Sequence, residues 1–390
     1  MKTGIACLIM AYVLSQFYRA FLAVMSPALS VDLGATPTDL ASASGYWFLT
    51  FAIMQIPVGA ALDKIGPRLT ASVLLGLGGG GGAALFAVAG SPTEIKLAMA
   101  LIGIGCSPVL MATYYIFARL YSPVVFGTLA GVVIGIGSLG NIGSSLPLTM
   151  AMEVFGWRGS LWALAAVSFA VAVAIGVFLR DPEKVAGGAK GSVLDLLRMP
   201  ALWLIFPLMA FNYLPAAGLR GLWVGPYFTD VFAADAARIG QVTLAMGFAM
   251  VLGNFAYGPL DRVFGTRKWV IFGGNSLALL CLLGLLAWPA AGGMATTLLI
   301  CGVGLFGASF PMIMAHGRAF FPPHLVGRGV TLMNLFGIGA TGVFQMITGR
   351  LHAATSGGAA EAPYVAIFGL YAAVLAIGLL IYLFSQDRRD

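Results

Sequence analysis

Two arginines stand inside stretches of the chain that are otherwise apolar. Arg19 lies in Tyr12–Asp32, and Arg220 lies in the similar stretch Tyr213–Asp230. In both, a tyrosine precedes the arginine by seven positions, and a proline and then an aspartate follow it. A guanidinium binds a carboxylate or phosphate through two parallel hydrogen bonds, which lysine does less well. The chemistry these residues suggest is the binding of an anion.

The composition places both arginines in a membrane protein. The chain has 390 residues, of which 60% are hydrophobic and 9% are charged, and its mean hydropathy is +0.96. Soluble proteins carry about 25% charged residues. The net charge of +7 and the pI of 9.3 come from cations scattered between apolar runs, so no nucleic-acid partner is expected. The four cysteines form no CxxC pair, and no enzyme activity, metal or cofactor is predicted.

Twelve apolar stretches are long enough to span a bilayer, which takes about 20 residues. Helices satisfy their own backbone in lipid, so the expected class is an all-α integral membrane protein. The longest polar interruption divides the chain into an N-terminal six-helix bundle (1–180), a linker (181–199) and a C-terminal six-helix bundle (200–390). The expected spans are 4–27, 41–62, 69–90, 95–120, 125–150, 159–179, 200–228, 238–260, 269–289, 295–320, 327–349 and 363–385.

The charges outside these spans indicate an orientation. With both termini in the cytoplasm, the outer loops hold only Lys96, Arg158, Arg238 and Arg350. This excess of cations inside fits the positive-inside rule and predicts a multi-pass protein of a bacterial inner (plasma) membrane. The predicted cytoplasmic cations are Lys2, Lys64, Arg68, Arg119, Arg180, Lys184, Lys190, Arg198, Arg262, Arg267, Lys268, Arg318, Arg328, Arg388 and Arg389.

No acidic residue is left for the membrane interior. All fourteen aspartates and glutamates fall in loops or at helix ends of this topology. An arginine at mid-membrane costs about 2.5–3.5 kcal/mol on insertion scales and usually marks a substrate path. Without an internal carboxylate, the expected partner of Arg19 and Arg220 is an anionic substrate. The alternative is structural: both side chains could extend towards the membrane surface or donate to tyrosines and carbonyls.

The two halves of the chain repeat. Gly59 to Arg68 reads GAALDKIGPR, and Tyr257 to Lys268 reads YGPLDRVFGTRK. Asp63 and Asp261 therefore hold matching places, at a spacing close to that of the two arginines. Such spacing implies two homologous six-helix bundles.

Twelve helices in a six-plus-six repeat, with G-x-x-x-D-K-x-G-P-R between the second and third, resemble the major facilitator superfamily. The resemblance implies alternating access between two bundles. It also implies a gate on the cytoplasmic side, in which the motif aspartate caps a neighbouring helix and pairs with loop arginines. The residues at those positions are Asp63, Arg68, Asp261 and Arg267. An exposed ion pair of about 0–1 kcal/mol is weak enough to break during such a cycle.

The paired arginines resemble the organic-anion and organophosphate branch of that superfamily, in which arginines of the first and seventh helices clamp the anion. The stretch Asn141–Pro147 fits the fifth helix of this branch. Phosphate-handling members carry a histidine just before that asparagine, where this chain has Gly140, so a carboxylate is favoured over a phosphate ester. The predicted substrate-binding residues are Arg19, Arg220, Tyr12, Gln16, Tyr213, Tyr114 and Asn141.

A proton or soft-metal site is the main alternative. His316 is the one histidine inside an expected span, and histidine exchanges protons near neutral pH. Thioether and imidazole ligands suit copper(I), so Met246, Met250, Met312 and His316 define a possible copper importer. Packing against neighbouring helices is the competing interpretation of all four.

The sequence thus predicts a monomeric secondary active transporter that moves a small organic anion across the bilayer, with Arg19 and Arg220 as the clamp. The sequence is compatible with three modes of transport, namely exchange, uniport, and symport of a proton carried by the substrate itself or by His316. A non-transporting membrane receptor is the second alternative.

Overall fold

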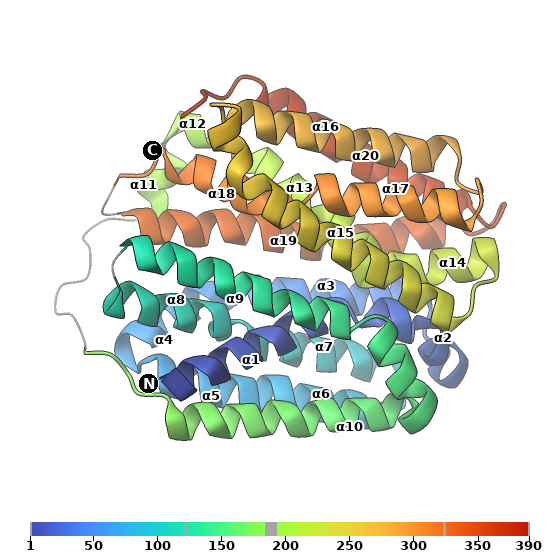
Figure 1. Cartoon of the computed structure of the whole chain (residues 1–390). Coiled ribbons are helices and arrows are strands. Elements are labelled where there is room, and N and C mark those ends of the chain that lie inside the picture. The colour runs from blue at the N-terminus through green and yellow to red at the C-terminus, as the bar shows by residue number, and fades with distance from the viewer. Residues whose placement is uncertain (1, 122, 184–192, 323–324, 389–390) are drawn as a thin grey trace. The chain divides into compact units, whose positions relative to one another are not determined.

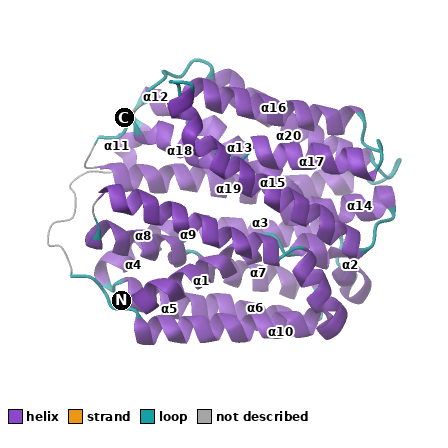
Figure 2. Ribbon diagram, viewed as in Figure 1, coloured by secondary structure: helices purple, strands orange, loops and turns teal. Residues whose placement is uncertain are grey.

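The computed structural model describes residues 2–121, 123–183, 193–322 and 325–388. Every regular element in these ranges is helical, and they contain no strand (Figure 2). This agrees with the all-α prediction. Lys184, Lys190 and Arg389, and residues 184–192 of the predicted linker 181–199, lie outside the described residues.

The chain forms two compact units. The first comprises Met1–Ala186 together with Asp235–Leu244, and the second comprises Gly187–Ala234 together with Ala245–Asp390. The helices of the first unit, coloured blue to green in Figure 1, are α1 (Lys2–Tyr18), α2 (Leu22–Leu33), α3 (Pro37–Ile53), α4 (Gln55–Lys64), α5 (Pro67–Leu74), the π-helical turn η1 (Leu75–Gly80), α6 (Gly81–Val88), α7 (Pro92–Cys106), α8 (Pro108–Leu120), α9 (Pro123–Gly143) and α10 (Leu146–Phe178).

The second unit runs from yellow-green to red in Figure 1 and contains a second π-helical turn, η2. Its elements are α11 (Val193–Leu197), α12 (Pro200–Trp203), α13 (Phe206–Gly218), η2 (Leu219–Trp223), α14 (Val224–Phe232), α15 (Ala236–Val263), which begins in the first unit, α16 (Lys268–Ala287), α17 (Gly293–Phe306), α18 (Phe310–Arg318), α19 (Val326–Thr355) and α20 (Ala362–Tyr382).

Ten of the described helical segments are long and apolar enough to cross a membrane, and the bent pair of α1 and α2 makes an eleventh. Helix α9 holds a shorter apolar stretch, Leu129–Gly143. The predicted fifth span, 125–150, is wrong at its end because α9 stops at Gly143. Pro147 lies in the first turn of α10, where a proline is well tolerated. Gly156 (φ 67°) makes a kink inside α10, which separates the helical segment before it from the longer apolar segment that ends at Phe178.

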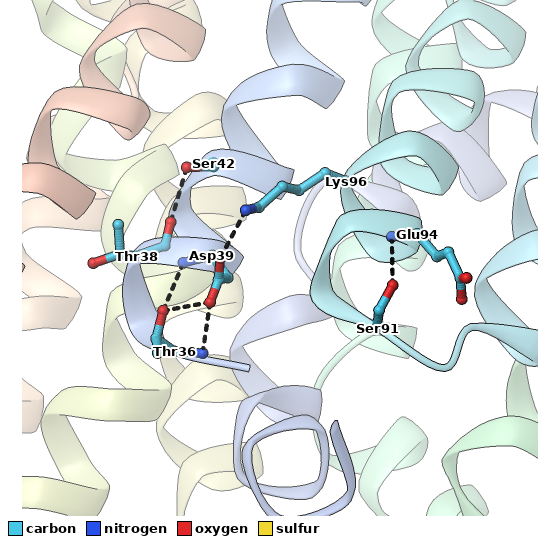
Figure 3. Close-up of polar contacts among 7 residues, drawn as sticks. All are labelled: Thr36, Thr38, Asp39, Ser42, Ser91, Glu94 and Lys96. Carbon is cyan, nitrogen blue, oxygen red and sulfur yellow. Dashed lines mark hydrogen bonds and ion pairs between the residues drawn. The ribbon is translucent and has the colours of Figure 1, made fainter. Parts of the chain in front are cut away.

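Glycines let the helices of the first unit approach closely. A Cβ at Gly105 of α7 would lie 2.0 Å from the backbone N of Gly79 in η1. The glycine run Gly78–Gly82 therefore serves close packing of the helices. At the other face of α7, Lys96 pairs with Asp39 of α3 at 2.7 Å, and Asp39 also completes a capping box with Thr36 (Figure 3).

The internal repeat extends to tertiary contacts. In the first unit, Trp157 of α10 donates to Asp32 of α2 at 2.7 Å. In the second, Tyr364 of α20 donates to Asp230 of α14. In each unit an aspartate near the end of the first transmembrane segment thus binds an aromatic side chain near the start of the last one.

A second pair of matching contacts caps the third transmembrane segment of each unit. Asp181 accepts from the backbone N–H of Arg68 at 2.7 Å, at the start of α5. Asp387 accepts from the backbone N–H groups of Arg267 and Lys268 at 3.1 and 2.9 Å, at the start of α16. A carboxylate placed there satisfies otherwise orphaned N–H groups and complements the helix dipole.

We predict that Asp387→Asn lowers the free energy of unfolding by about 1 kcal/mol at neutral pH, the usual loss for a helix cap. Partial burial works against the charged form of Asp387, but hydrogen bonds from Thr266 and from the backbone N–H groups of Lys268 and Arg267 outweigh it. The pKa of Asp387 is therefore lower than usual. Its contribution is present above the ordinary aspartate pKa of about 3.9 and is lost as the pH falls through the lowered value.

Thermal unfolding of the purified protein measures this effect. Glu183→Gln removes an exposed acid two positions after Asp181 and is the matched control, with no expected change. Equal losses in the two variants would show that general surface charge, rather than the cap, supports the helix.

Candidate functional site

Arg19 lies where the first transmembrane segment leaves helical geometry. Helix α1 ends at Tyr18, α2 begins at Leu22, and the two meet at an angle of 53°. The guanidinium carbon is 5.2 Å from the ring centroid of Trp47 and 5.1 Å from that of Phe51, both on α3. The two rings stack at 5.1 Å, so the cation rests on an aromatic pair.

Two N–H groups in this place have no hydrogen-bond acceptor among the described residues. They are the Nε of Arg19 and the indole Nε1 of Trp47, both buried. No carboxylate of the described residues forms an ion pair with Arg19 under a 4.0 Å limit. Each unsatisfied buried donor of this kind lowers the stability of the fold by about 1–3 kcal/mol. A ligand with acceptor oxygens could form the missing hydrogen bonds.

Three of the residues predicted to share a site with Arg19 lie close to one another, namely Tyr12, Gln16 and Tyr114. Gln16 donates to the Tyr12 hydroxyl at 2.6 Å, and Tyr114 of α8 packs against the buried cluster that contains Tyr12. Asn141 lies near the end of α9, where its carbonyl accepts from Ser144 at 3.0 Å.

Gly140 has a structural reason to be glycine. A Cβ there would lie 1.9 Å from the carbonyl oxygen of Val13, so the backbones of α1 and α9 are in contact. A histidine at this position would force the two helices apart.

Arg220 also lies at an irregularity. It belongs to η2, the π-helical turn inside the seventh transmembrane segment, and its residue exposure is only 5%. Such turns widen the hydrogen-bond spacing and occur often at functional sites. A Cβ at Gly247 of α15 would lie 3.9 Å from Nη1 of Arg220, so the absence of a side chain there leaves space beside the guanidinium. Tyr213, one of its predicted neighbours, contacts Phe310 at a centroid distance of 5.7 Å.

Polar side chains flank η2. Trp223 donates to Thr348 of α19 at 3.1 Å, and Tyr371 of α20 donates to Gln345 at 3.5 Å. A Cβ at Gly218 would lie 2.0 Å from the Tyr371 hydroxyl, so this hydroxyl reaches the backbone at the start of the turn. The Nε2 of Gln345 is buried and has no acceptor among the described residues.

Several of these contributors were missed as candidates. Trp47 and Phe51 are spaced i, i+4, which places them on one helix face, and that spacing was the available signal. Thr348 and Tyr371 gave no signal in their own segments, because their role depends on where α19 and α20 meet η2.

The predicted gate residues differ between the halves. Asp261 and Arg267 form an ion pair at 3.2 Å with side chains only 18% and 10% exposed, and Arg267 also donates to the carbonyl of Ala315 at 3.2 Å. Asp63 instead faces Arg119 of α8 at 3.9 Å, and its side chain is 70% exposed. Arg68 contributes its backbone N–H to Asp181.

His316 has hydrogen bonds at both ring nitrogens. Nε2 lies 2.9 Å from the carbonyl of Gln386 and Nδ1 lies 2.7 Å from the Tyr382 hydroxyl. A carbonyl can only accept, so Nε2 carries a proton, and in the neutral ring Nδ1 accepts from the Tyr382 hydroxyl. A neutral His316 is satisfied in this way, with no nitrogen left for a metal ion.

The methionines of the alternative metal site serve packing. Met246 and Met250 of α15 lie against Gly304 of α17, and Met312 is buried on α18. The prediction that His316 is the one histidine within a span is wrong. Helix α19 continues to Thr355 and therefore includes His352 as well. His352 stacks on Trp223 at 5.2 Å and lies 3.4 Å from the Tyr364 hydroxyl.

Comparison with known proteins gives a family match and three notable relatives. The model of the Major Facilitator Superfamily matches residues 8–224. The putative transporter AraJ of Escherichia coli is 30% identical over 48% of this chain and 47% of its own length. The probable L-galactonate transporter of Escherichia coli is 26% identical over 47% of the chain and 40% of the relative. The probable sulfoacetate transporter SauU of Cupriavidus necator is 25% identical over 47% and 42%. The matches thus span under half the length of these relatives.

Solved structures match over nearly the whole chain. A D-xylose–proton symporter has a TM-score of 0.81 at 13% identity, over 99% of this chain and 98% of that one. A bacterial homologue of the human lysosomal transporter Spinster, inward-facing and occupied, has a TM-score of 0.77 at 15% identity over the same shares. At these identities the likeness concerns the fold alone. The family model matches more than half of the residues of this chain. The chain therefore belongs to the major facilitator superfamily, a family of membrane transporters rather than enzymes.

Proposed function

We propose that this transporter moves a small organic anion across a bacterial inner membrane by alternating access, with Arg19 and Arg220 as the clamp. The observation that carries the proposal is the setting of Arg19: a cation inside a transmembrane segment, stacked on Trp47 and Phe51, with a buried Nε–H that no described acceptor satisfies. An anion would supply both the charge and the acceptor.

The position of Arg220 supports the same role. Each arginine lies where regular helix geometry is interrupted, at the break between α1 and α2 or in η2. Transporters of this kind build their sites from interrupted helices. The repeat places the two interruptions at matching points of the two halves.

A carboxylate is the preferred substrate class. Two relatives are named for L-galactonate and sulfoacetate, and both of those compounds carry a carboxylate. The contact between Gly140 and the carbonyl of Val13 leaves no room for the histidine that the phosphate-handling branch would place there. Copper import is not proposed, since His316 uses both ring nitrogens and Met246 and Met250 pack against Gly304.

The remaining elements of the proposal follow from the sequence. The protein acts as a monomer with both termini in the cytoplasm, and its two bundles (1–180 and 200–390) move as bodies joined by the linker 181–199. The anion lowers the barrier to that motion because the state in which both arginines contact it binds it more tightly.

We predict that Arg19→Lys and Arg220→Lys each reduce uptake or counterflow of the carboxylate substrate by about tenfold or more. Lysine keeps the charge but loses the paired hydrogen bonds, which are worth about 1.5–3 kcal/mol. A thermal-shift screen of small organic anions first identifies the ligand, and counterflow in proteoliposomes then measures transport.

Arg238→Lys is the matched control, because Arg238 is only half-buried and its guanidinium donates to the side chain of Gln241 at 3.3 Å. Wild-type rates in both clamp variants would remove the anion clamp. A protein that transports no anion in a broad panel would remove the proposed function itself.

The gate residues give a second prediction. Asp261→Asn should lower the free energy of unfolding by about 1.5–3 kcal/mol, because it weakens charged hydrogen bonds from the largely buried Arg267. Asp63→Asn should cost less than about 1 kcal/mol, because the Asp63 side chain is mostly exposed and its partner is at 3.9 Å.

Denaturant unfolding of the two variants in one detergent measures the difference. The two residues occupy the same place in the repeated motif, so each serves as the control for the other. Equal destabilisation would contradict the asymmetry and would favour a gate shared evenly between the two units.

A further inference from the structure

A cavity of about 500 Å³ lies in the second unit between α15, α16 and α17. We call it the α15–α16 groove, and its lining includes Gly253, Ala256, Gly273, Phe264, Trp269 and Leu277. Small residues on both helices leave the space open. A Cβ built at Gly273 would have no atom within 4 Å among the described residues.

The interior of the α15–α16 groove suits hydrocarbon. Its lining is almost wholly apolar, and the hydroxyl of Tyr257, the main polar group that reaches it, donates to the carbonyl of Phe306 at 2.6 Å. A polar ligand would find few partners there and would lose its hydration.

The groove has the depth of one membrane leaflet. Trp269 and Leu277 are eight residues apart on α16, about 12 Å at 1.5 Å per residue. Half of a hydrocarbon core is about 15 Å. Phe264, Trp269 and Leu277 are 66%, 53% and 44% exposed, so the rim faces the surroundings of the helices. Trp269 lies in the first turn of α16, a place where tryptophan often marks the membrane surface.

Two cations flank the loop whose residues Phe264 and Thr266 line the groove, Arg262 in the last turn of α15 and Lys268 at the start of α16. The Arg262 guanidinium is exposed, and the described residues offer it no ion pair. Lys268 lies 5.1 Å from the Trp269 ring and donates to the carbonyl of Leu383. The acids nearby are already engaged, Asp261 by Arg267 and Asp387 by Thr266 and the start of α16.

We propose that the α15–α16 groove binds one acyl chain of an anionic phospholipid, with the headgroup phosphate at Arg262 and Lys268. Basic residues next to membrane-spanning helices select anionic headgroups at about 1 kcal/mol per cation. The bound lipid holds α15 and α16 together beside the Asp261–Arg267 ion pair. Membrane composition thereby acts on the end of the unit at which the gate is proposed.

Lipid binding to the purified full-length protein tests the proposal. Phosphatidylglycerol and phosphatidylcholine with the same palmitoyl and oleoyl chains are titrated in a mild detergent, and native mass spectrometry counts the retained lipids. The wild-type protein should retain phosphatidylglycerol about thirtyfold more strongly, as two cations would give. Gly273→Leu fills the groove and should lose that retention.

Gly258→Leu is the matched control, because a Cβ there also meets no described atom within 4 Å and Gly258 does not line the groove. It should bind phosphatidylglycerol as the wild type does. The double variant Arg262→Gln/Lys268→Gln should bind both lipids equally, at the wild-type level for phosphatidylcholine.

Equal retention of the two lipids by the wild-type protein would overturn the charge-selected site. Wild-type retention in Gly273→Leu would overturn the groove as its location. Should Gly273→Leu fail to fold, the double variant still decides, since an unchanged preference for phosphatidylglycerol there also refutes the proposal.

Discussion

A guanidinium inside a membrane loses the water that would solvate it, and the protein must replace that solvation. In the first unit the replacement is incomplete. The rings of Trp47 and Phe51 lie 5.2 and 5.1 Å from Arg19 and offer up to about 2 kcal/mol of cation–π attraction. They accept no hydrogen bond in the plane of the guanidinium, so the Nε–H stays unsatisfied. Arg19 lies at the break between α1 and α2, outside regular helix geometry. The proposed substrate would supply the hydrogen-bond acceptor that the aromatic pair lacks.

Hydrogen bonds within each unit hold its transmembrane segments together. Asp32 and Trp157 join the first and last segments of the first unit, as Asp230 and Tyr364 do in the second. Carboxylates after the last segment, Asp181 and Asp387, cap the third segment in the same way in both. Each unit therefore has stabilising contacts of its own at both ends of its helices. The proposed motion of the two bundles as whole bodies requires none of these contacts to break.

Much of the fold was predictable from the sequence, because the length of each apolar stretch and the recurrence of motifs in the two halves can be read from the residues themselves. The end of the fifth segment was misplaced, since Asn141–Pro147 carries no charge that would end a span and the left-handed conformation at Gly156 has no sequence signature beyond glycine. The π-helical turn at Arg220 was not predictable. It coincides with the reach of Tyr371 to the backbone at Gly218, a contact between segments about 150 residues apart. The Asp387 cap was missed for the same reason.

The surroundings of the two arginines differ in a way that bears on the substrate. Arg19 has aromatic faces beside it, which favour the apolar or planar part of a ligand next to its anionic group. The turn that holds Arg220 is flanked by the indole of Trp223 and by Thr348, Gln345 and Tyr371, and Gln345 retains a buried N–H without an acceptor. In the proposed clamp, the half that the second unit supplies therefore offers hydrogen bonds as well as charge. An anion with a polar group at one end and a carboxylate at the other satisfies both halves, whereas a fatty-acid-like anion leaves the Nε2 of Gln345 without an acceptor.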